Sequence, residues 1–250
     1  MGFRVGQLLA IAWGLVVAGA QEGDFSQHQN SAPRVQQART EKAQEVRALF
    51  AKAQVAYPAR RLLLRAFKAD NQLELWAGDG QGPLTLVTTY AICARSGSLG
   101  PKRMQGDGQV PEGFYVVDRF NPTSNFHLSL GVSYPNTSDR QLGRVGHLGG
   151  DIFIHGDCVT IGCIPIETEP IKALYLIALD TKLTFGSTIA VQIFPTRMTA
   201  EGLQRLHNLA QEDTELWAFW QNLVPGYTYF EEHHLPAPVV VDPKTGRYRW

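Results

Sequence analysis

The feature that most constrains the fold is a series of three short apolar runs between Arg61 and Cys93. The runs read RLLLRAFKA, LELWAG and LTLVTTYAIC, and polar or Gly-rich turns such as Asp70-Asn71 and Gly78-Asp79-Gly80 separate them. Short apolar or alternating runs bounded by such turns are typical of β-strands. The sequence therefore predicts a β-rich core that begins just after Pro58.

Further strands and four helices are expected around this core. The first helix covers Arg34 to Tyr57 and has apolar residues at offsets of three, four and seven. The others begin near Thr168, the expected N-cap, near Thr199 and near Asp213. The remaining strand candidates are Phe114 to Asp118, Phe126 to Val132, Gly150 to His155 and Thr188 to Phe194.

A long Gly-rich loop, ARSGSLGPKRMQGDGQVPEG, follows the third apolar run. Loops of this length in a compact domain are often functional, so we expect it to frame a site. Its charged residues Lys102, Arg103 and Asp107 are candidates for contacts with substrate carboxylates, although solvated loop charges are the simpler explanation.

The first twenty residues have the pattern of a secretory signal. Arg4 precedes the apolar stretch Leu8 to Val17, and the small residues Ala18-Gly19-Ala20 suit a signal peptidase. An uncleaved membrane anchor is the alternative, but the stretch is shorter than the roughly 20 residues needed to span a bilayer. We expect an exported protein without stable membrane insertion after signal cleavage.

The balance of charge argues against two classes of partner. Lys and Arg together number 23, as do Asp and Glu, so no net charge concentrates nucleic acid or an anionic membrane. The sequence has no GxGxxG or phosphate-loop pattern, and we expect no nucleotide cofactor.

The segment HGDCVTIGC, residues 155–163, holds one histidine and two cysteines, and has three interpretations. A zinc site would use His155, Cys158 and Cys163 with His147, but this spacing fits the usual ligand pairs poorly. A disulfide would join Cys158 to Cys163 or to Cys93, because export favours oxidised thiols. Three cysteines leave one without a partner in either case.

The third interpretation is a nucleophilic cysteine beside its base. Cys163 and His155 can meet only if the chain doubles back, and Gly156 and Gly162 are where it could do so. The N–H groups of Gly162 and Cys163 could then hold an oxyanion. A neighbouring imidazole would lower the pKa of the thiol and hold it as a thiolate.

IHGDCVTIGC resembles the signature of the L,D-transpeptidase (YkuD-type) catalytic domain, in which an I-H-G segment supplies a histidine and S-H-G-C supplies the cysteine. The HGxCxSxGC form of the YafK-type branch is more similar still. QGDGQVPEGFY, FNPTSNFHLSLGVSYPN, LGGDIFIHG and VQIFPTRMT, followed by LWAFWQNLVPGYTYFEE, continue the resemblance over roughly residues 60 to 232.

The resemblance implies that Cys163 is the nucleophile and His155 the base, and Gly162 matches the glycine before the cysteine. Thr160 matches the Ser or Thr of the cysteine segment and is a candidate substrate contact. Gly156 and His127 are two further candidates, although His127 is as well explained as a histidine within a sheet. Two positions depart from the pattern: Ile161 replaces the usual second histidine, and Pro165 replaces an Arg or Asn.

For the fold, the resemblance implies an α+β architecture, a mixed and mainly antiparallel β-sandwich with an N-terminal helix and C-terminal helices. The expected parts are a signal peptide (1–20), a polar, flexible leader followed by a helix (21–58), a catalytic domain (59–198) and a C-terminal helical extension and tail (199–250).

For the function, the resemblance implies an enzyme of the bacterial periplasm that acts on peptidoglycan stem peptides, with no metal or other cofactor. Cys163 would attack the carbonyl at the L-centre of meso-diaminopimelate and form a thioester, which an amine or water resolves. In the YafK-type branch this chemistry can release an outer-membrane lipoprotein. The alternative is a catalytically silent peptidoglycan-binding or scaffold protein of the same fold, in which Ile161 and Pro165 mark lost chemistry.

Overall fold

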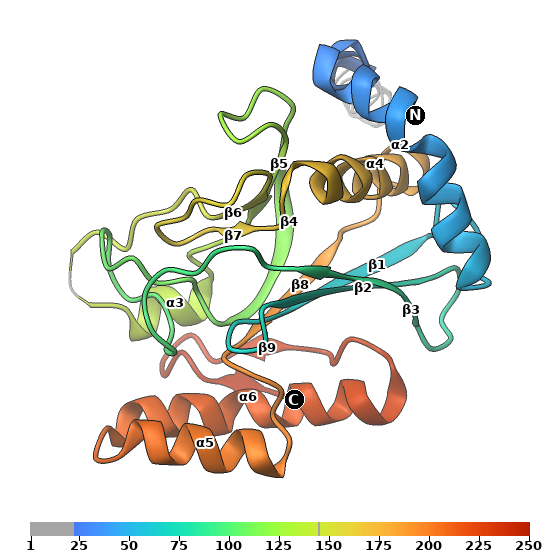
Figure 1. The fold of residues 1–250 in the computed structure, drawn as a ribbon. Helices are drawn as coiled ribbons and strands as arrows, with labels where there is room; N and C mark the ends of the chain where they lie inside the picture. Colours follow the sequence, from blue (N-terminus) through green and yellow to red (C-terminus); the bar gives the residue numbers. More distant parts are fainter. Residues whose placement is uncertain (1–22, 145) are drawn as a thin grey trace, which may run out of the picture.

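The computed structural model describes residues 23–144 and 146–250 (Figure 1). The expected signal peptide, residues 1–20, lies outside these ranges. Within them, no helix combines the length and the apolar character needed to cross a membrane.

Eight strands form one curled sheet, in the order β3-β2-β1-β8-β4-β5-β6-β7. The pairs β1/β8 and β6/β7 are parallel, and the other neighbours are antiparallel. This confirms the predicted mixed, mainly antiparallel architecture. The strands are β1 (Arg61–Phe67), β2 (Gln72–Gly78), β3 (Thr85–Ala91), β4 (Gly113–Asn121), β5 (Ser129–Val132), β6 (Phe153–His155), β7 (Ile164–Pro165) and β8 (Ala190–Phe194).

The curl of the sheet brings its two edge strands together. Cys93, which follows β3, donates its backbone N–H to the carbonyl of Pro165 in β7 at 3.0 Å. Residues that are 72 positions apart in the sequence therefore lie side by side. This closure places the loop after β3 against the segment that carries His155 and Cys163.

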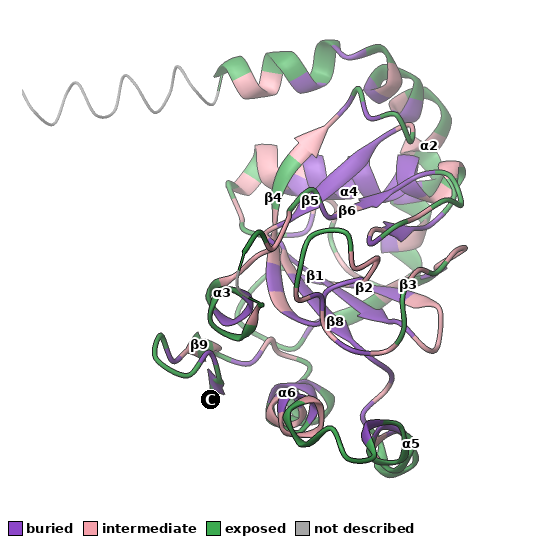
Figure 2. Cartoon of the chain, turned by 90° about the vertical axis from the view of Figure 1, so that its left-hand side faces the viewer, coloured by how far each residue is buried: buried purple, intermediate pink, exposed green. Residues whose placement is uncertain are grey.

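Helices cover the sheet on opposite sides (Figures 1 and 2). They are α2 (Pro33–Lys52), α3 (Thr137–Leu142), α4 (Thr168–Phe185), α5 (Ala200–Ala210) and α6 (Thr214–His233). A separate two-stranded sheet pairs β9 (Val240–Val241) with β10 (Tyr248–Arg249). A strand is present in each predicted region, although β5 begins at Ser129 rather than at Phe126 and β6 begins at Phe153 rather than at Gly150. Elements α3, β7, β9 and β10 were not predicted, because elements of two to six residues show no measurable period.

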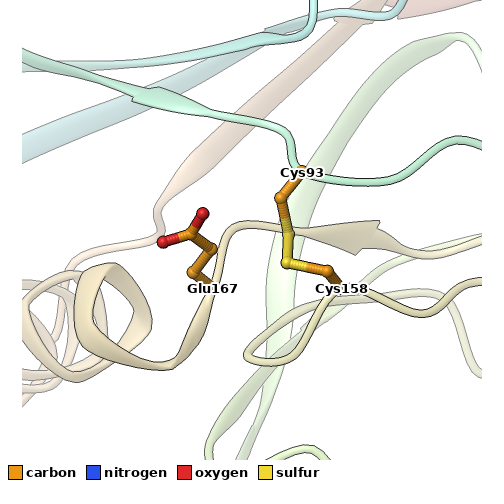
Figure 3. Close-up of side chains that lie close together, drawn as sticks. All are labelled: Cys93, Cys158 and Glu167. Atoms are coloured by element: carbon orange, nitrogen blue, oxygen red, sulfur yellow. A yellow bond between two sulfur atoms is a disulfide. The ribbon is translucent and has the colours of Figure 1, made fainter.

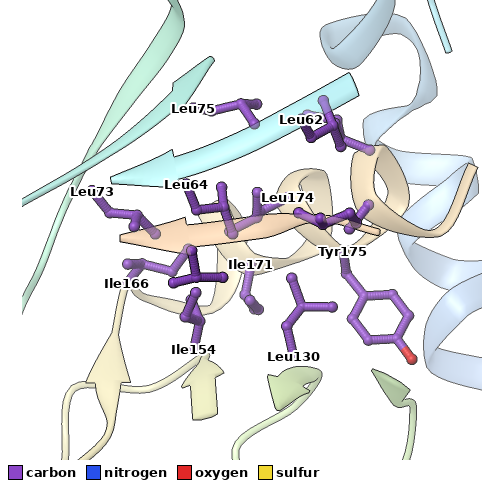
Figure 4. Close-up of a cluster of buried hydrophobic side chains, with 14 of the residues drawn as sticks. Leu62, Leu64, Leu73, Leu75, Leu130, Ile154, Ile166, Ile171, Leu174 and Tyr175 are labelled. Carbon is purple, nitrogen blue, oxygen red and sulfur yellow. The ribbon is translucent and has the colours of Figure 1, made fainter. Parts of the chain in front are cut away.

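Alternation along β1 explains the two hydrophobic cores. Leu62 and Leu64 join Ile171 and Leu174 of α4 in the main core (Figure 4). Phe67 points to the other face, where it packs with residues of α6 such as Tyr227. Each fully buried Leu or Phe contributes about 1.5–3 kcal/mol, so both helical layers are held mainly by burial.

The N-terminal segment is docked on this body. Residues 23–31 are helical, so the expectation of a flexible leader was wrong. The buried Gln29 explains the difference: its amide donates to the Phe120 carbonyl at 3.2 Å and accepts from the Tyr175 hydroxyl at 2.5 Å. The next helix, α2, ends at Lys52 rather than at Tyr57, two residues before Gln54 takes a positive φ of 56°.

The predicted starts of the later helices are largely confirmed. Thr199 caps α5 by accepting from the Gly202 N–H, and Asp213 caps α6 by accepting from the Leu216 N–H. The N-cap prediction for α4 was wrong by one residue, because Glu167 holds that position. The Thr168 hydroxyl donates instead to Asp157 at 3.0 Å, and so it holds the turn that follows His155.

Candidate active site

The chain doubles back between His155, the last residue of β6, and Cys163, which lies just before the neighbouring strand β7. The parallel pairing of β6 with β7 aligns Ile154 with Ile164 and His155 with Pro165. Cys163 directly precedes β7. By this register Cys163 stands level with Phe153, two positions before His155, and the Phe153 N–H lies against its thiol. The turn that the nucleophile hypothesis requires is present.

A disulfide decides how the three cysteines are used. Cys93 and Cys158 are bonded, with their Cα atoms 5.3 Å apart, and Cys163 is a free, half-buried thiol (Figure 3). Glu167 lies beside the two bonded sulfur atoms. The bond removes Cys158 from the set of zinc ligands that the sequence suggested, because thiolates rather than disulfides bind zinc.

The thiol of Cys163 sits against backbone. Its Sγ donates to the carbonyl of Asp151 at 3.5 Å. Burial raises the pKa of the Cys163 thiol; the Phe153 N–H opposes this shift and the Asp151 charge adds to it. The sequence led us to expect a lowered pKa, which is wrong for this arrangement, because desolvation of the thiolate outweighs the nearby donor.

The imidazole of His155 is almost fully buried, with 1% of its surface exposed. It stacks on Phe126, with ring centroids 4.5 Å apart, and its Nδ1 lies against the carbonyl of Gly156. A carbonyl only accepts, so this contact assigns the proton to Nδ1 and leaves the lone pair on Nε2. Burial lowers the pKa of His155, which keeps the ring neutral and able to take a proton.

Thr160 is an internal brace of the turn. Its Oγ1 accepts from the N–H groups of Gly162 at 3.1 Å and Cys163 at 2.8 Å, and it donates to the Cys163 carbonyl at 2.9 Å. We expected a substrate contact at Thr160 and open oxyanion donors at Gly162 and Cys163. In this structure the same three groups satisfy one another, so the expected oxyanion hole is closed.

The two glycines of the turn are required by close packing. Gly162 has a φ of 140°, and a Cβ there would lie 3.1 Å from the Gln109 carbonyl oxygen. At Gly156 a Cβ would lie 2.7 Å from the carbonyl oxygen of Phe126. Real Cβ atoms essentially never come within 3.0 Å of another atom and rarely within 3.4 Å, so both glycines serve close approach of neighbouring segments. For Gly156 this is a role in packing, and the substrate contact that we expected there stays a prediction.

His127 is neither in a strand nor at the cavity described below. It precedes β5 with a positive φ of 72°, and its carbonyl accepts from Arg34 at 2.6 Å. The buried Nε2 of His127 has no hydrogen-bond partner among the described residues. His127 is therefore not a histidine within a sheet, and the expected substrate contact at His127 stays a prediction.

The two departures from the family pattern have different surroundings. Ile161 is 89% exposed, so its side chain lies in solvent at the tip of the turn. Pro165 is buried in β7 opposite His155. The loop charges are not solvated as the simpler explanation supposed: Lys102 is buried and bonded to Asp107 at 2.7 Å.

A cavity of about 190 Å³ opens beside the thiol. The loop after β3 forms one wall and the ends of β1 and β7 form the others, so this loop frames a site as the sequence predicted. The lining residues are Ala66, Lys68, Ile92, Ala94, Arg95, Ser96, Gly97, Ser98, Leu99, Val110, Cys163 and Ile164.

Sequence reasoning missed two residues that contact the site. Phe126 supports the His155 ring, and Asp151 accepts from the thiol. Nothing in the local pattern of Phe126 distinguishes it from a strand residue. Asp151 follows Gly149-Gly150, and its φ of 55° marks a turn that the sequence could have shown but that we read as a strand.

Known proteins are similar to this chain over most of its length. The family described as YkuD, the L,D-transpeptidase catalytic domain, matches residues 63–191. YafK of Escherichia coli (strain K12), whose name assigns it provisionally as an L,D-transpeptidase, is 37% identical over 188 residues, which cover 74% of this chain and 72% of YafK.

Two solved structures are also similar. The helical cell shape determining protein Pgp2 from Campylobacter jejuni is 17% identical, with 73% of each chain covered and a TM-score of 0.46. Bd1075 of Bdellovibrio bacteriovorus is 22% identical, with 70% of this chain and 64% of that chain covered and a TM-score of 0.39.

Proposed function

Because the chain belongs to the L,D-transpeptidase catalytic domain family, we propose that it is an exported cysteine enzyme that cleaves an amide of peptidoglycan stem peptides through a thioester on Cys163. The observation that carries the proposal is a free thiol that lines a cavity and stands, by the pairing of β6 with β7, two residues from the level of a buried histidine. The bond cleaved is the amide at the L-centre of meso-diaminopimelate.

The first step needs a base, because both groups are neutral at rest. The pKa of the thiol is raised and that of the imidazole is lowered by burial. Nε2 of His155 therefore takes the proton as Cys163 Sγ attacks the carbonyl carbon, rather than holding a thiolate beforehand. The C–N bond then breaks, the imidazolium protonates the departing amine, and the acyl group stays on sulfur.

The second step reverses these roles. An amine or a water molecule attacks the thioester carbonyl, His155 takes the proton of the attacking group, and the Cys163 thiol is restored. An amine acceptor gives a crosslink or an attached protein, and water gives a hydrolase. Release of a lipoprotein linked to peptidoglycan is one case of the second outcome.

The developing oxyanion needs donors that the resting structure keeps closed. The N–H groups of Gly162 and Cys163 serve this role only when Thr160 Oγ1 releases at least one of them. A small shift of the Thr160 side chain is enough, because the hydroxyl is the shared partner of both groups. We place this reaction in the periplasm, where stem peptides are accessible and where a signal peptide at residues 1–20 would direct the chain.

The test is intact mass spectrometry of the mature protein incubated with a tetrapeptide stem that contains diaminopimelate. We expect a thioester adduct or a product that needs Cys163, and loss of at least 10³-fold in rate in Cys163→Ala and His155→Ala with unchanged circular dichroism. Full activity in Cys163→Ala would refute the mechanism. Binding of the peptide without any adduct or product, from a reduced thiol, would favour the silent scaffold.

A further inference from the structure

Two polar groups in the cavity beside Cys163 lack a partner. The Oγ of Ser96 is buried and makes no hydrogen bond within the described part of the chain. Arg95, its neighbour in sequence, also lines the cavity, and its guanidinium forms no salt bridge among the described residues. Buried polar groups in native proteins usually have partners, so this unsatisfied hydroxyl, in a residue that lines the cavity, can pair with a ligand once its side chain turns toward the cavity.

A third polar side chain of the cavity is already satisfied. The ammonium of Lys68 donates to the carbonyls of Gly100 at 2.8 Å and Val110 at 2.9 Å, and to Glu112 at 2.9 Å. An ammonium has three N–H donors, so none is left for a ligand. The side-chain donors available to a bound molecule are therefore those of Arg95 and Ser96, together with the hydroxyl of Ser98, which accepts from Gln109 at 2.9 Å and keeps its own hydrogen.

The rest of the lining is mainly apolar. It includes Ala66, Ile92, Leu99 and Ile164. Such walls accept a short aliphatic group, and a guanidinium with a hydroxyl beside it recognises a carboxylate by charge-assisted hydrogen bonds. A molecule that combines the two, an amino acid residue with a free carboxylate, fits this chemistry.

We propose that Arg95 and Ser96 form a carboxylate subsite, which binds a free carboxylate of the substrate while Cys163 attacks the neighbouring carbonyl. This inference rests on the proposed function and adds which group of the substrate the enzyme recognises. Two carboxylates of a tetrapeptide stem have this chemistry: that of the terminal D-alanine, which leaves, and that at the D-centre of diaminopimelate, which stays on the enzyme.

Arg119 provides a matched control. It also lies near the thiol, since its Nη1 bonds at 2.9 Å to the side chain of Asp151, whose carbonyl contacts Cys163. It is already paired with Asp118 and Asp151, and it does not line the cavity. Arg119→Gln removes the same charge from the same neighbourhood without touching the proposed subsite.

The experiment measures binding by calorimetry in the Cys163→Ala background, so that turnover is not needed. Three peptides are compared: the free acid, the amide of the terminal D-alanine, and the amide at the D-centre of diaminopimelate. We expect one amide to bind about 10- to 100-fold more weakly than the acid, the size of a hydrogen bond between charged groups, and this amide identifies the carboxylate.

In Arg95→Gln the free acid should bind as weakly as that amide, and the preference between them should disappear. Ser96→Ala should weaken binding of the acid about threefold to tenfold, whereas Arg119→Gln should leave both the affinity and the preference unchanged.

Three results would overturn the subsite: equal binding of all three peptides to the parent protein, unchanged binding in Arg95→Gln, or loss of the preference in Arg119→Gln alone. Failure of the proposed function is seen separately, as the absence of a Cys163-dependent product while the carboxylate preference persists. If no peptide binds at all, the subsite fails as well.

Discussion

At the scale of single residues, the site differs from a preformed thiolate–imidazolium pair. Cys163 and His155 are both partly or fully removed from water, and burial disfavours the charged form of each. Reactivity then depends on proton transfer during attack, for which the neutral Nε2 of His155 is the acceptor. Substrate binding, rather than a standing charge, would activate the thiol.

This difference can be measured by alkylation of the free thiol. The rate of alkylation by iodoacetamide should rise with pH through a midpoint above 9.0, because burial raises the pKa of Cys163 above that ordinary value for a cysteine. Only the thiolate reacts, and burial suppresses it at neutral pH. Cys163→Ala, which keeps the Cys93–Cys158 disulfide, gives the background rate. A midpoint below pH 7 would instead establish the thiolate pair.

At the scale of elements, the turn between β6 and β7 is held from several sides. The disulfide joins it to the end of β3, Thr168 of α4 bonds to Asp157, and Thr160 closes it internally. None of these anchors contacts the thiol with its side chain, yet together they set where Cys163 lies. A short turn with external anchors keeps its geometry because few backbone angles remain free.

The first prediction at this scale concerns the disulfide between Cys93 and Cys158. Cys93 and Cys158 are 65 residues apart, so the bond removes much freedom from the unfolded chain. Cys158→Ala should lower the free energy of unfolding by about 2–4 kcal/mol, measured by urea denaturation. Cys163→Ala is the control and should be nearly unchanged. An equal loss in both variants would show that the disulfide adds no particular stability.

The second prediction at this scale concerns the N-terminal helix α2. Arg34 donates to the carbonyls of Ser124 and His127, and so it holds the segment whose Phe126 stacks on His155. Arg34→Ala should reduce kcat/KM about tenfold or more through misplacement of the imidazole, with a smaller effect on KM. Arg47→Ala, an exposed change on the same helix, should have no effect. Equal kinetics of both variants would contradict this link.

At the scale of the whole molecule, buried polar contacts join the C-terminal strands to the sheet. Asp139 of α3 accepts from the hydroxyl of Tyr115 in β4 at 3.0 Å, and Asn136 donates to the hydroxyl of Tyr248 in β10 at 3.1 Å. Burial raises the pKa of Asp139 to about 6, although the Asn136 N–H and Arg103 oppose the shift. Stability should therefore depend on pH through this carboxyl.

The direction of this pH dependence follows from the pKa of Asp139 in the folded and unfolded states. The pKa of Asp139 is about 6 in the folded protein and 3.8 for an ordinary aspartate, so the folded state binds the proton more tightly. The protonated carboxyl of Asp139 therefore stabilises the folded state fully below pH 3.8. This stabilisation is lost as pH rises through about 6, which lowers the free energy of unfolding by up to about 3 kcal/mol.

Urea denaturation from pH 4 to 7 should show this fall in wild type relative to Asp139→Asn, with the exposed Asp118→Asn as control. A difference between wild type and Asp139→Asn that does not vary with pH would contradict the prediction.

Prediction from the sequence succeeded where the deciding interactions are local and failed where they join residues far apart in the chain. Strands β1 to β3 and the helix starts near Thr199 and Asp213 were predicted because the periodicity that marks them is local. The N-cap of α4 was missed, because the Thr168 hydroxyl is used by Asp157, eleven positions earlier. The segment 23–31 was misread because its anchor, Gln29, finds its partners at Phe120 and Tyr175.

The sequence by itself determined the strand and helix pattern, the family resemblance and the choice of Cys163 and His155 as candidates. Only the tertiary structure decided that Cys158 pairs with Cys93, that Thr160 closes the oxyanion donors, and that Arg95 and Ser96 share a cavity with the thiol. The physical reason is the curl of the sheet. It brings the end of β3 against β7, and contacts between residues so far apart in the chain leave no periodic signal in it.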